Sequence, residues 1–575
     1  MTDSWQPIYL SAKVFGHLSQ GLYRTPAGAV KELISNSFDA DAQVVKLHTG
    51  FPQFETFSCE DDGKGMSQDE FRRLMNRGIG SSYKRTISPL TTQSGRPVIG
   101  RLGLGILSLA QICTRFEIVS HHKETKTAFR ATIKFPPYTR QEMDKIAKKA
   151  LEDDDEIHGG EYQLVEERYI SAKHGLRIYT KYLRESFRKR MRNLTRLGNK
   201  VVFKRTGPYK TFEQFLDVIY ANTLTQSLNL LSDYDQLIFG LALAAPLPLH
   251  DIRNLATELP SVEERQSAVK AFGFRVFVDN LELRNPVALP SNRTGTKAAQ
   301  CSLVNRKRQE FELKDGSYKE AVTVTQHRVA VRNSDEHFSL YELKYSNPNV
   351  AGTPLEFRGY LFQQTGRLYP RDIQGVLIRI SNVAIGKYDN SMMTYPYAEG
   401  PRYAMISSEL FVVRGFDDAL NIDRDSFNEL HPHYMRVQAF MHSMLHDLIF
   451  PETWGEEKLR NKQRREKEAE EVDRRFVQSL RQTTGEKIKS IQRVERPRES
   501  QAEQRTSQSP VEFRPAKGEI EVDRAHPLLA PLFRRKKHAS LVEKLVVAFE
   551  RANQEPNPTK RRELFYRILA DIFQR

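Results

Sequence analysis

Three polar side chains share one face of a helix that the sequence predicts near the start of the chain. Residues 31–40 read KELISNSFDA, and a 3.6-residue period brings Glu32, Asn36 and Asp39 to the same side. Two carboxylates and an amide in one stripe could serve a ligand, whereas the ordinary explanation for polar groups on a helix is contact with solvent. The segments that follow decide between these two explanations.

A short turn with two glycines comes next. Residues 60–66 read EDDGKGM, so Asp61 precedes Gly63 and Gly65 at the end of a predicted strand. Glycine relieves the positive φ that such turns need, and an ordinary polar turn explains the pattern when it is taken alone.

A second glycine-rich segment, VIGRLGLGILSLAQI at 98–112, leads into an apolar helical run. Glycine lets backbone N–H groups approach an anion closely, so a glycine-rich turn before a helix N-terminus can cradle a phosphate. The spacing G-x-x-G-x-G by itself matches many unrelated loops. The glycines concerned are Gly100, Gly103 and Gly105.

Together, the order and spacing of these segments resemble the GHKL ATPase superfamily, whose nucleotide-binding domain has the Bergerat fold. The shared elements are a helix with E-x-x-x-N-x-x-D-A, a strand and turn with D-x-G-x-G, and G-x-x-G-x-G before a helix. The superfamily includes HtpG-type heat-shock chaperones, MutL, MORC proteins, type II topoisomerases and histidine kinases. The resemblance implies an α/β fold (an α+β sandwich) over residues 1–190, with ATP and Mg²⁺ as its ligands.

The resemblance also implies a role for each residue of the helical stripe and for the carboxylate after it. Asn36 would coordinate Mg²⁺, because an amide oxygen suits a hard ion whose charge is balanced by phosphate. Asp61 would accept a hydrogen bond from the adenine amino group. Glu32 would deprotonate the attacking water, a role worth roughly 10²–10⁴-fold in rate. Because histidine kinases of this superfamily lack that glutamate, its presence favours hydrolysis over phosphotransfer.

Further nucleotide contacts follow from the same resemblance, and residues 77–99 would form a lid over the bound nucleotide, with Gly78 and Gly80 as hinges. The sequence GIGSSYK in the lid resembles the S-x-K of MORC proteins. One departure concerns a Gly-Thr pair that these families often carry on a late strand, where this chain has Gly175 followed by Leu176. The predicted contacts are Asp39, Gly63, Gly65, Met66, Ser82, Lys84, Gly100, Gly103 and Gly105.

A second resemblance lies much later in the chain. Residues 412–430, VVRGFDDALNIDRDSFNEL, resemble the segment of HtpG-type chaperones in which a middle-domain arginine contacts the γ-phosphate. The resemblance implies that Arg424 is a catalytic arginine, worth roughly 10³–10⁵-fold in phosphoryl transfer, with Asn428 one turn further on the same helix face. A local ion pair with Asp423 or Asp425 is the alternative for Arg424.

Composition changes along the chain predict its division into domains. Residues 451–483 read as a charged, solvent-exposed helix and residues 521–575 as amphipathic helices, opened by a capping box of Ser540 and Glu543. The apolar stripe Leu541, Leu545 and Phe549 would pack on a partner or on this chain's own body. The remaining predicted segments are 1–190 (ATPase domain), 191–345 (connector), 346–450 (middle or transducer domain) and 484–520 (flexible linker).

The charge and the cysteine content of the chain limit its expected binding partners and its expected cellular compartment. The formal net charge is +16, and residues 451–575 hold 29 Lys and Arg against 21 Asp and Glu. A basic tail suits a polyanionic partner, although a solubilising surface explains it equally well. Three widely spaced cysteines, no signal-peptide pattern and no membrane-spanning run predict a soluble cytoplasmic protein. The superfamily's usual N-terminal closure predicts a homodimer.

Two functions use the same predicted ATPase. The favoured one is an ATP-driven clamp that remodels a protein client, as HtpG-type chaperones do, because the segment at 412–430 is chaperone-like. The alternative is a MORC- or MutL-like clamp on nucleic acid, supported by the sequence around the first helix and by basic runs such as RRKK at 534–537. A regulatory or defence-system ATPase module is a third possibility.

Overall fold

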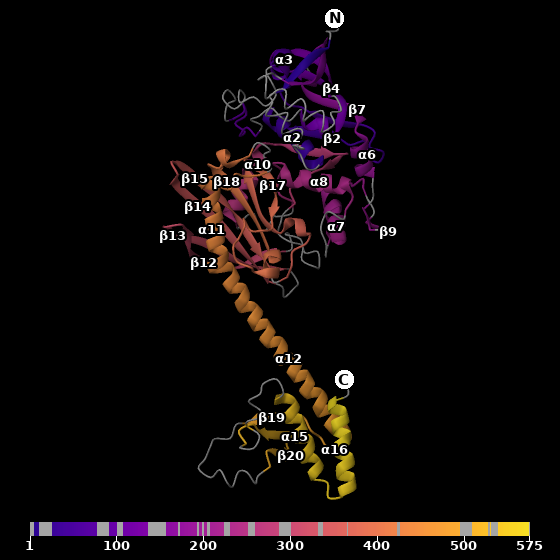
Figure 1. Cartoon of the computed structure of the whole chain (residues 1–575), viewed down its shortest axis with the longest axis vertical. Coiled ribbons are helices and arrows are strands. Elements are labelled where there is room, and N and C mark those ends of the chain that lie inside the picture. Colours follow the sequence, from indigo (N-terminus) through magenta and orange to yellow (C-terminus); the bar gives the residue numbers. More distant parts are fainter. Residues whose placement is uncertain are drawn as a thin grey trace. The chain divides into compact units, whose positions relative to one another are not determined.

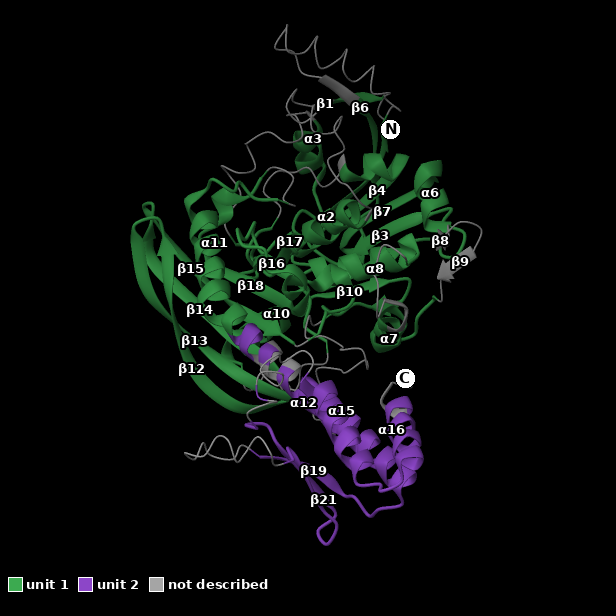
Figure 2. Cartoon of the chain, turned by 60° about the horizontal axis from the view of Figure 1, so that its bottom comes forward, with its two compact units in different colours: residues 1–451 green, residues 452–575 purple. Residues whose placement is uncertain are grey.

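The chain divides into two compact units, residues 1–451 and residues 452–575, which are described separately (Figure 2). The computed structural model describes residues 5–10, 26–76, 91–99, 107–135, 157–170, 173–192, 195–197, 200–203, 207–223, 231–250, 259–286, 301–331, 337–364, 366–421, 426–494, 509–526, 530 and 539–573.

The first unit begins with a nine-stranded sheet. Neighbouring strands pair antiparallel except β2 and β10, which run parallel, so a strand far along the sequence completes the N-terminal sheet. The sheet therefore extends the first domain beyond the predicted boundary at 190. In spatial order the strands are β1 (Gln6–Leu10), β6 (Ile157–Glu167), β5 (Thr127–Lys134), β4 (Cys113–His122), β7 (Gly175–Leu183), β3 (Phe57–Asp61), β2 (Val44–His48), β10 (Arg275–Val278) and β11 (Leu281–Glu282).

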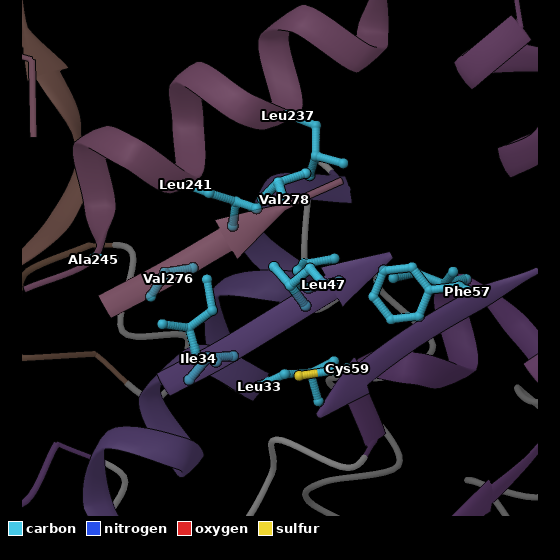
Figure 3. Packing of buried hydrophobic residues seen from close by; sticks show 14 of the residues in the cluster. Leu33, Ile34, Leu47, Phe57, Cys59, Leu237, Leu241, Ala245, Val276 and Val278 are labelled. Atoms are coloured by element: carbon cyan, nitrogen blue, oxygen red, sulfur yellow. The ribbon is translucent and has the colours of Figure 1, made fainter. Parts of the chain in front are cut away.

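Helix α2 (Pro26–Asp39) packs on this sheet beside α8 (Asp233–Ala244) (Figure 1). Its apolar face is fully buried, because leucine and isoleucine at adjacent positions meet side chains from three strands and from α8. The residues that meet there include Leu33 and Ile34 (α2), Leu47 (β2), Cys59 (β3), Val276 (β10) and Leu241 (α8) (Figure 3).

The next helix, α3 (Gln68–Asn76), begins where the sequence SQDE at 67–70 predicts a helix start with Ser67 as N-cap and Glu70 completing a capping box. The Ser67 hydroxyl accepts a hydrogen bond from the Glu70 amide at 3.2 Å, and the Glu70 carboxylate accepts one from the Ser67 amide at 2.8 Å. This reciprocal pair is a capping box. Other elements of this part are η1 (Leu107–Gln111), α6 (Glu185–Arg192), β8 (Thr195–Leu197), β9 (Lys200–Phe203) and α7 (Phe212–Thr223).

A seven-stranded sheet forms the rest of the first unit. Helix α11 (Pro432–Met444) packs on one face through Phe440, and α10 (Pro260–Ala271) packs on the other against β14 and β15. The sheet begins at Cys301 and not at the predicted position 346, because three earlier strands pair continuously with β15. In spatial order the strands are β12 (Cys301–Asp315), β13 (Tyr318–Val331), β14 (His337–Val350), β15 (Thr353–Gln363), β18 (Ile406–Arg414), β16 (Gly375–Ile380) and β17 (Val383–Asp389).

The second unit contains most of a 35-residue helix, α12 (Phe450–Thr484), with a small sheet and two helices beyond it. The predicted linker at 484–520 contains two of the strands, so this prediction is wrong for residues 490–494 and 511–514. Its other elements are β19 (Ser490–Val494), β20 (Val511–Arg514), β21 (Glu519–Asp523), α15 (Ala539–Asn553) and α16 (Pro558–Phe573).

The last helices pack inside their own unit through a face that does not include the predicted stripe, and the predicted capping role of Glu543 is wrong. Val547 and Ala548 form the buried face of α15, whereas Phe549 of the predicted stripe is 53% exposed. Glu543 does not cap the helix, because its buried carboxylate accepts hydrogen bonds from Arg493 at 3.0 Å and Arg524 at 2.6 Å. Among the helices that the structure describes, none has the length and apolar character needed to cross a bilayer.

Candidate nucleotide site

The three residues of the polar stripe on α2 differ in their exposure to solvent. Glu32 is buried, with 8% of its surface exposed, while Asn36 and Asp39 are partly exposed. Glu32 and Asn36 are four residues apart and therefore neighbours on the helix surface. From these positions Glu32 could present its carboxylate, and Asn36 its amide oxygen, to one ligand. The sequence predicts that Glu32 acts on the attacking water and that Asn36 binds the metal ion.

Asp61 ends β3 and is connected directly to α2. The Ser37 hydroxyl donates to its Oδ2 atom at 2.9 Å. The backbone amides of Gly63 and Leu176 donate to Oδ1 at 3.0 and 3.4 Å. Asp62, the next residue, is used differently, because its carboxylate accepts hydrogen bonds from the amides of Gln43 and Val44, at 2.7 and 2.8 Å.

The donors around Asp61 are all neutral. Desolvation of its carboxyl group raises its pKa to about 6, and the hydrogen bonds from Gly63, Ser37 and Leu176 offset this only in part. No Lys or Arg of the described residues forms an ion pair with it. At neutral pH the group is an acceptor of hydrogen bonds that lacks a local counter-charge.

The missing Gly-Thr pair has a structural counterpart. Gly175 has φ +115°, and a Cβ atom there would lie 2.0 Å from the Asp61 carbonyl oxygen, so only glycine fits. Leu176 supplies its amide to Asp61, and the Ser37 hydroxyl on α2 donates to the same carboxylate. The four-residue spacing from Leu33 to Ser37 places Ser37 on the sheet-facing side of the helix, which is the signal that could have identified it.

The glycine turn after Asp61 is held from two sides. A Cβ atom on Gly63 would lie 2.7 Å from the Ala40 carbonyl oxygen, and one on Gly65, whose φ is +72°, would lie 2.5 Å from the His121 carbonyl oxygen. The Met66 amide donates to the Ser120 hydroxyl at 2.8 Å, and that hydroxyl donates back to the Met66 carbonyl at 2.9 Å. These contacts fix the turn between the end of α2 and β4.

Residues 91–99 of the predicted lid are anchored to the C-terminal end of α2. The Ile99 amide donates to Asp39 at 2.7 Å, so Asp39 holds the chain immediately before the glycine-rich segment. The Thr92 hydroxyl donates to Asp41 at 2.5 Å. Arg96 is buried and donates to the carbonyls of Ala42 and Phe272, both at 2.6 Å.

The remaining lid and phosphate-loop predictions concern residues outside the described ones. They include Gly78, Gly80, Ser82, Lys84, Gly100, Gly103 and Gly105. The described residues on either side of the glycines are both tied to α2. Ile99 contacts its last residue, Asp39, and the Ser108 hydroxyl donates to the Ala29 carbonyl in its first turn at 2.8 Å.

The two catalytic residues predicted from the later segment differ in outcome. Arg424 lies outside the described residues. Asn428 is described, but the prediction that it lies on a helix is wrong. It directly follows Phe427, which forms a bridge with Leu420, and its side chain accepts a hydrogen bond from the Leu430 amide at 3.1 Å. The helix starts later because Pro432 favours its first position.

The donor set suits a magnesium ion that is bound chiefly by its nucleotide. Within the part of the chain that the structure describes, no group of three or more His, Cys, Asp or Glu side chains could hold a metal ion. Magnesium commonly takes one or two protein ligands and completes its shell with phosphate and water. Asn36, partly exposed beside Glu32, would be the protein ligand here.

Comparison with known proteins shows which family the N-terminal part of the chain resembles. Residues 23–161 match the family described as histidine kinase-, DNA gyrase B- and HSP90-like ATPase. The match includes α2, β3 and the glycine-rich segment at 98–112. The N-terminal part of the chain is therefore a GHKL ATPase domain.

Several curated proteins are similar to a part of the chain. The chain is 32% identical over 120 residues to a putative type II restriction enzyme, HgiDII, of Herpetosiphon aurantiacus, covering 21% of this chain and 19% of that protein. It is 28% identical over 134 residues (23% and 20%) to the DNA mismatch repair protein MutL of Anaplasma phagocytophilum. It is 30% identical over 108 residues (19% and 17%) to MutL of Porphyromonas gingivalis. The chain spans about a fifth of the length of these relatives.

Proposed function

We propose that the chain is a magnesium-dependent ATPase that binds ATP in the first sheet and uses it to control a clamp on nucleic acid. The observation that supports this best is the Asp61 carboxylate, held by three neutral donors beside α2 in a domain of the GHKL class. The names of the MutL and restriction-enzyme relatives support the choice of nucleic acid as partner.

Each side chain then has a chemical task. Asp61 accepts a hydrogen bond from the adenine amino group, which excludes guanine because its corresponding group is an acceptor. Glu32 takes a proton from the attacking water, and its burial beside the site keeps the base close to its target. Asn36 holds the magnesium ion, which when bound neutralises phosphate charge.

Other residues act by holding these groups in place. Asp39 fixes Ile99 and thereby the entry to the glycine-rich segment, whose N–H groups would contact phosphate. Arg424 would supply a positive charge to the γ-phosphate when the domains close. Nucleotide binding would drive that closure to the extent that it binds the closed form more tightly, and a nearly complete shift needs about 5 kcal/mol.

The test measures ATP hydrolysis by the full-length protein with and without Mg²⁺, and with and without duplex DNA. We expect turnover that requires Mg²⁺ and changes when DNA is added. Absence of ATP binding would refute the nucleotide assignment. ATP turnover that does not change when duplex DNA is added would refute nucleic acid as the partner, but it would not refute the ATPase activity.

A further inference from the structure

Positive charge is segregated along the β12–β13 hairpin. Near its turn, Lys314 and Lys319 both lie 3.9 Å from Glu312. At the other end, residues 301–309 and 321–331 contain four basic residues and no Asp or Glu. These four, which we call the β12 basic cluster, are Arg306, Lys307, Arg308 and Arg328, and all are exposed.

The cluster lacks the counter-charges that neutralise other basic segments. None of its members forms an ion pair within the described residues, and the one hydrogen bond made by Arg308 is to the Thr323 hydroxyl, at 3.4 Å. On α12, by contrast, three of the basic residues pair with glutamates four residues away. The Lys462–Glu466 and Arg464–Glu468 contacts are 3.9 and 2.7 Å long, and Arg475 pairs with Glu471 in the same way.

The position of β12 in the sheet leaves the cluster open to a large ligand. Among the described residues the strand is the last in the seven-stranded sheet, so one of its sides has no described strand partner. Arg306 and Arg308 point to the sheet face on which α10 packs against β14 and β15, and Lys307 lies opposite Gln326 on the other face. Three consecutive cations thus reach both faces of an accessible edge.

A protective role is the simplest competing explanation. Charged side chains on an edge strand prevent it from pairing with another chain. That role needs charge of either sign, whereas a polyanion needs positive charge specifically. The two explanations therefore separate when the sign of the cluster is reversed.

We propose that the β12 basic cluster binds the phosphate backbone of nucleic acid. The inference rests on the proposed function and names the surface through which the partner is held. Arginine and lysine contacts of this kind position a protein on nucleic acid without reading sequence. The surface lies on the second sheet, whereas Glu32, Asn36 and Asp61 belong to elements of the first sheet and the helix packed on it.

The test is fluorescence anisotropy with a labelled 30-base-pair duplex of mixed sequence, between 50 and 200 mM KCl. The variant carries Arg306→Glu, Lys307→Glu and Arg308→Glu in the full-length chain. Its matched control carries Lys462→Glu, Arg464→Glu and Arg475→Glu, which changes net charge equally on α12. ATP turnover without DNA and elution from a sizing column are measured for all three proteins.

We expect the β12 variant to lose duplex binding and the control to retain it. Each phosphate contact contributes about 0.9 to the slope of log affinity against log salt, so any residual binding should show a slope flatter by about three. Basal ATP turnover and elution should stay unchanged, because charge of either sign protects the edge.

Three results would overturn the proposal in different ways. Wild-type binding that the β12 substitutions leave intact would show that the surface is wrong while the proposed function stands. Competition by poly-glutamate as strong as that by an oligonucleotide of equal charge would show a general acidic ligand, such as a protein surface. Wild-type protein that binds no duplex, yet hydrolyses ATP, would remove the nucleic-acid partner altogether.

Discussion

The two large sheets each hold a desolvated carboxylate, but the surroundings differ. On the first sheet, Asp61 receives hydrogen bonds only from neutral groups, and desolvation raises its pKa. On the second sheet, Glu409 is fully buried and pairs with Arg379. Burial alone would raise the pKa of Glu409, but the charges of Arg379 and Arg265, with hydrogen bonds from Arg379 and Tyr360, bring it below its usual value.

The difference separates a carboxylate that can take a ligand from one that holds the fold together. Both Glu409 oxygens are used, since Tyr360 and Tyr388 donate to Oε1 at 2.7 and 3.0 Å and Arg379 donates to Oε2. Among the described residues, the Asp61 Oδ2 atom accepts a hydrogen bond only from the Ser37 hydroxyl, which leaves it capacity for a second donor. A desolvated acceptor without a counter-charge is a feature typical of functional sites.

The largest expected effect is that of Asp61→Asn. An asparagine can still accept from the Gly63 and Leu176 amides, but its NH₂ group would face the adenine amino group. We expect loss of ATP binding, measured by calorimetry, together with a higher melting temperature of the nucleotide-free protein, because the desolvated charge is gone. Unchanged ATP affinity would contradict the assignment.

Asp62→Asn is the matched control for this substitution. Its remaining oxygen can keep the hydrogen bonds to Gln43 and Val44. The ATP affinity of Asp62→Asn should therefore stay close to that of the wild type. If it fell as far as that of Asp61→Asn, both residues would have only a structural role at the end of the strand.

The second largest effect is expected when the buried carboxylate of Glu32 is removed. Glu32→Ala should bind ATP and hydrolyse it roughly 10²–10⁴-fold more slowly, because the base is lost while the adenine contacts remain. Single-turnover hydrolysis and equilibrium binding measure the two parts separately. Near-normal turnover would refute the role of Glu32 as the base.

Glu409→Gln tests the other side of the comparison. It leaves the buried Arg379 and Arg265 guanidinium groups without their counter-charge, and we expect a loss of about 3–5 kcal/mol in the free energy of unfolding. Denaturant unfolding measures this. A loss below about 1 kcal/mol would show that the pair has little structural role.

The two carboxylates should also respond to pH in opposite directions. A raised pKa means that the folded state holds its proton more tightly, so the stabilising effect of Asp61→Asn should be full above pH 6 and vanish near pH 4. The Glu409→Gln deficit should persist at neutral pH and shrink as the pH falls below about 4.5, because the glutamate pKa is lowered in the fold. Unfolding curves between pH 4 and 8 would show both trends, and parallel trends would contradict them.

The smallest effect is expected at Arg265, on α10. Its guanidinium group is buried over the Phe411 ring, and none of its nitrogens has a hydrogen-bond partner among the described residues. Burial and the nearby Arg379 lower its pKa to about 10. Arg265→Met should leave the free energy of unfolding unchanged or raise it by about 1–2 kcal/mol. A clear loss in denaturant unfolding would show that the arginine is used.

The sequence predicted the first domain better than the second, for physical reasons. The helix of Glu32 and the strand of Asp61 carry local signals, namely a helical period and a glycine turn, and the capping box of Ser67 and Glu70 is confirmed. The contribution of β10 to the first sheet depends on pairing across more than 200 residues, which no local pattern encodes. Strands β12 and β14 escaped prediction because β12 is largely polar along its length.

The candidate site was predicted in part as well. The stripe of α2 and the choice of Asp61 over Asp62 came from spacing and from the family resemblance. The Leu176 amide was not predicted, because a backbone donor leaves no sign in the sequence. Ser37 was missed although its spacing from Leu33 places it on the sheet-facing side of the helix. The roles of Glu32, Asn36 and Arg424 stay predictions, and Asn428 was placed on a helix that starts at Pro432.

Helix α10 is attached at both ends to parts of the molecule with different tasks. Just beyond its last turn, the Phe272 carbonyl accepts a hydrogen bond from Arg96, which lies before the glycine-rich segment. In its first turn, the amide and hydroxyl of Ser261 donate to Glu342 of β14, at 3.1 and 3.0 Å. Because α10 is bonded at both ends, a displacement at one end would move the other. If ATP strengthens the grip of the second sheet on its partner, the partner must tighten ATP binding by the same factor, because linkage between two ligands is reciprocal.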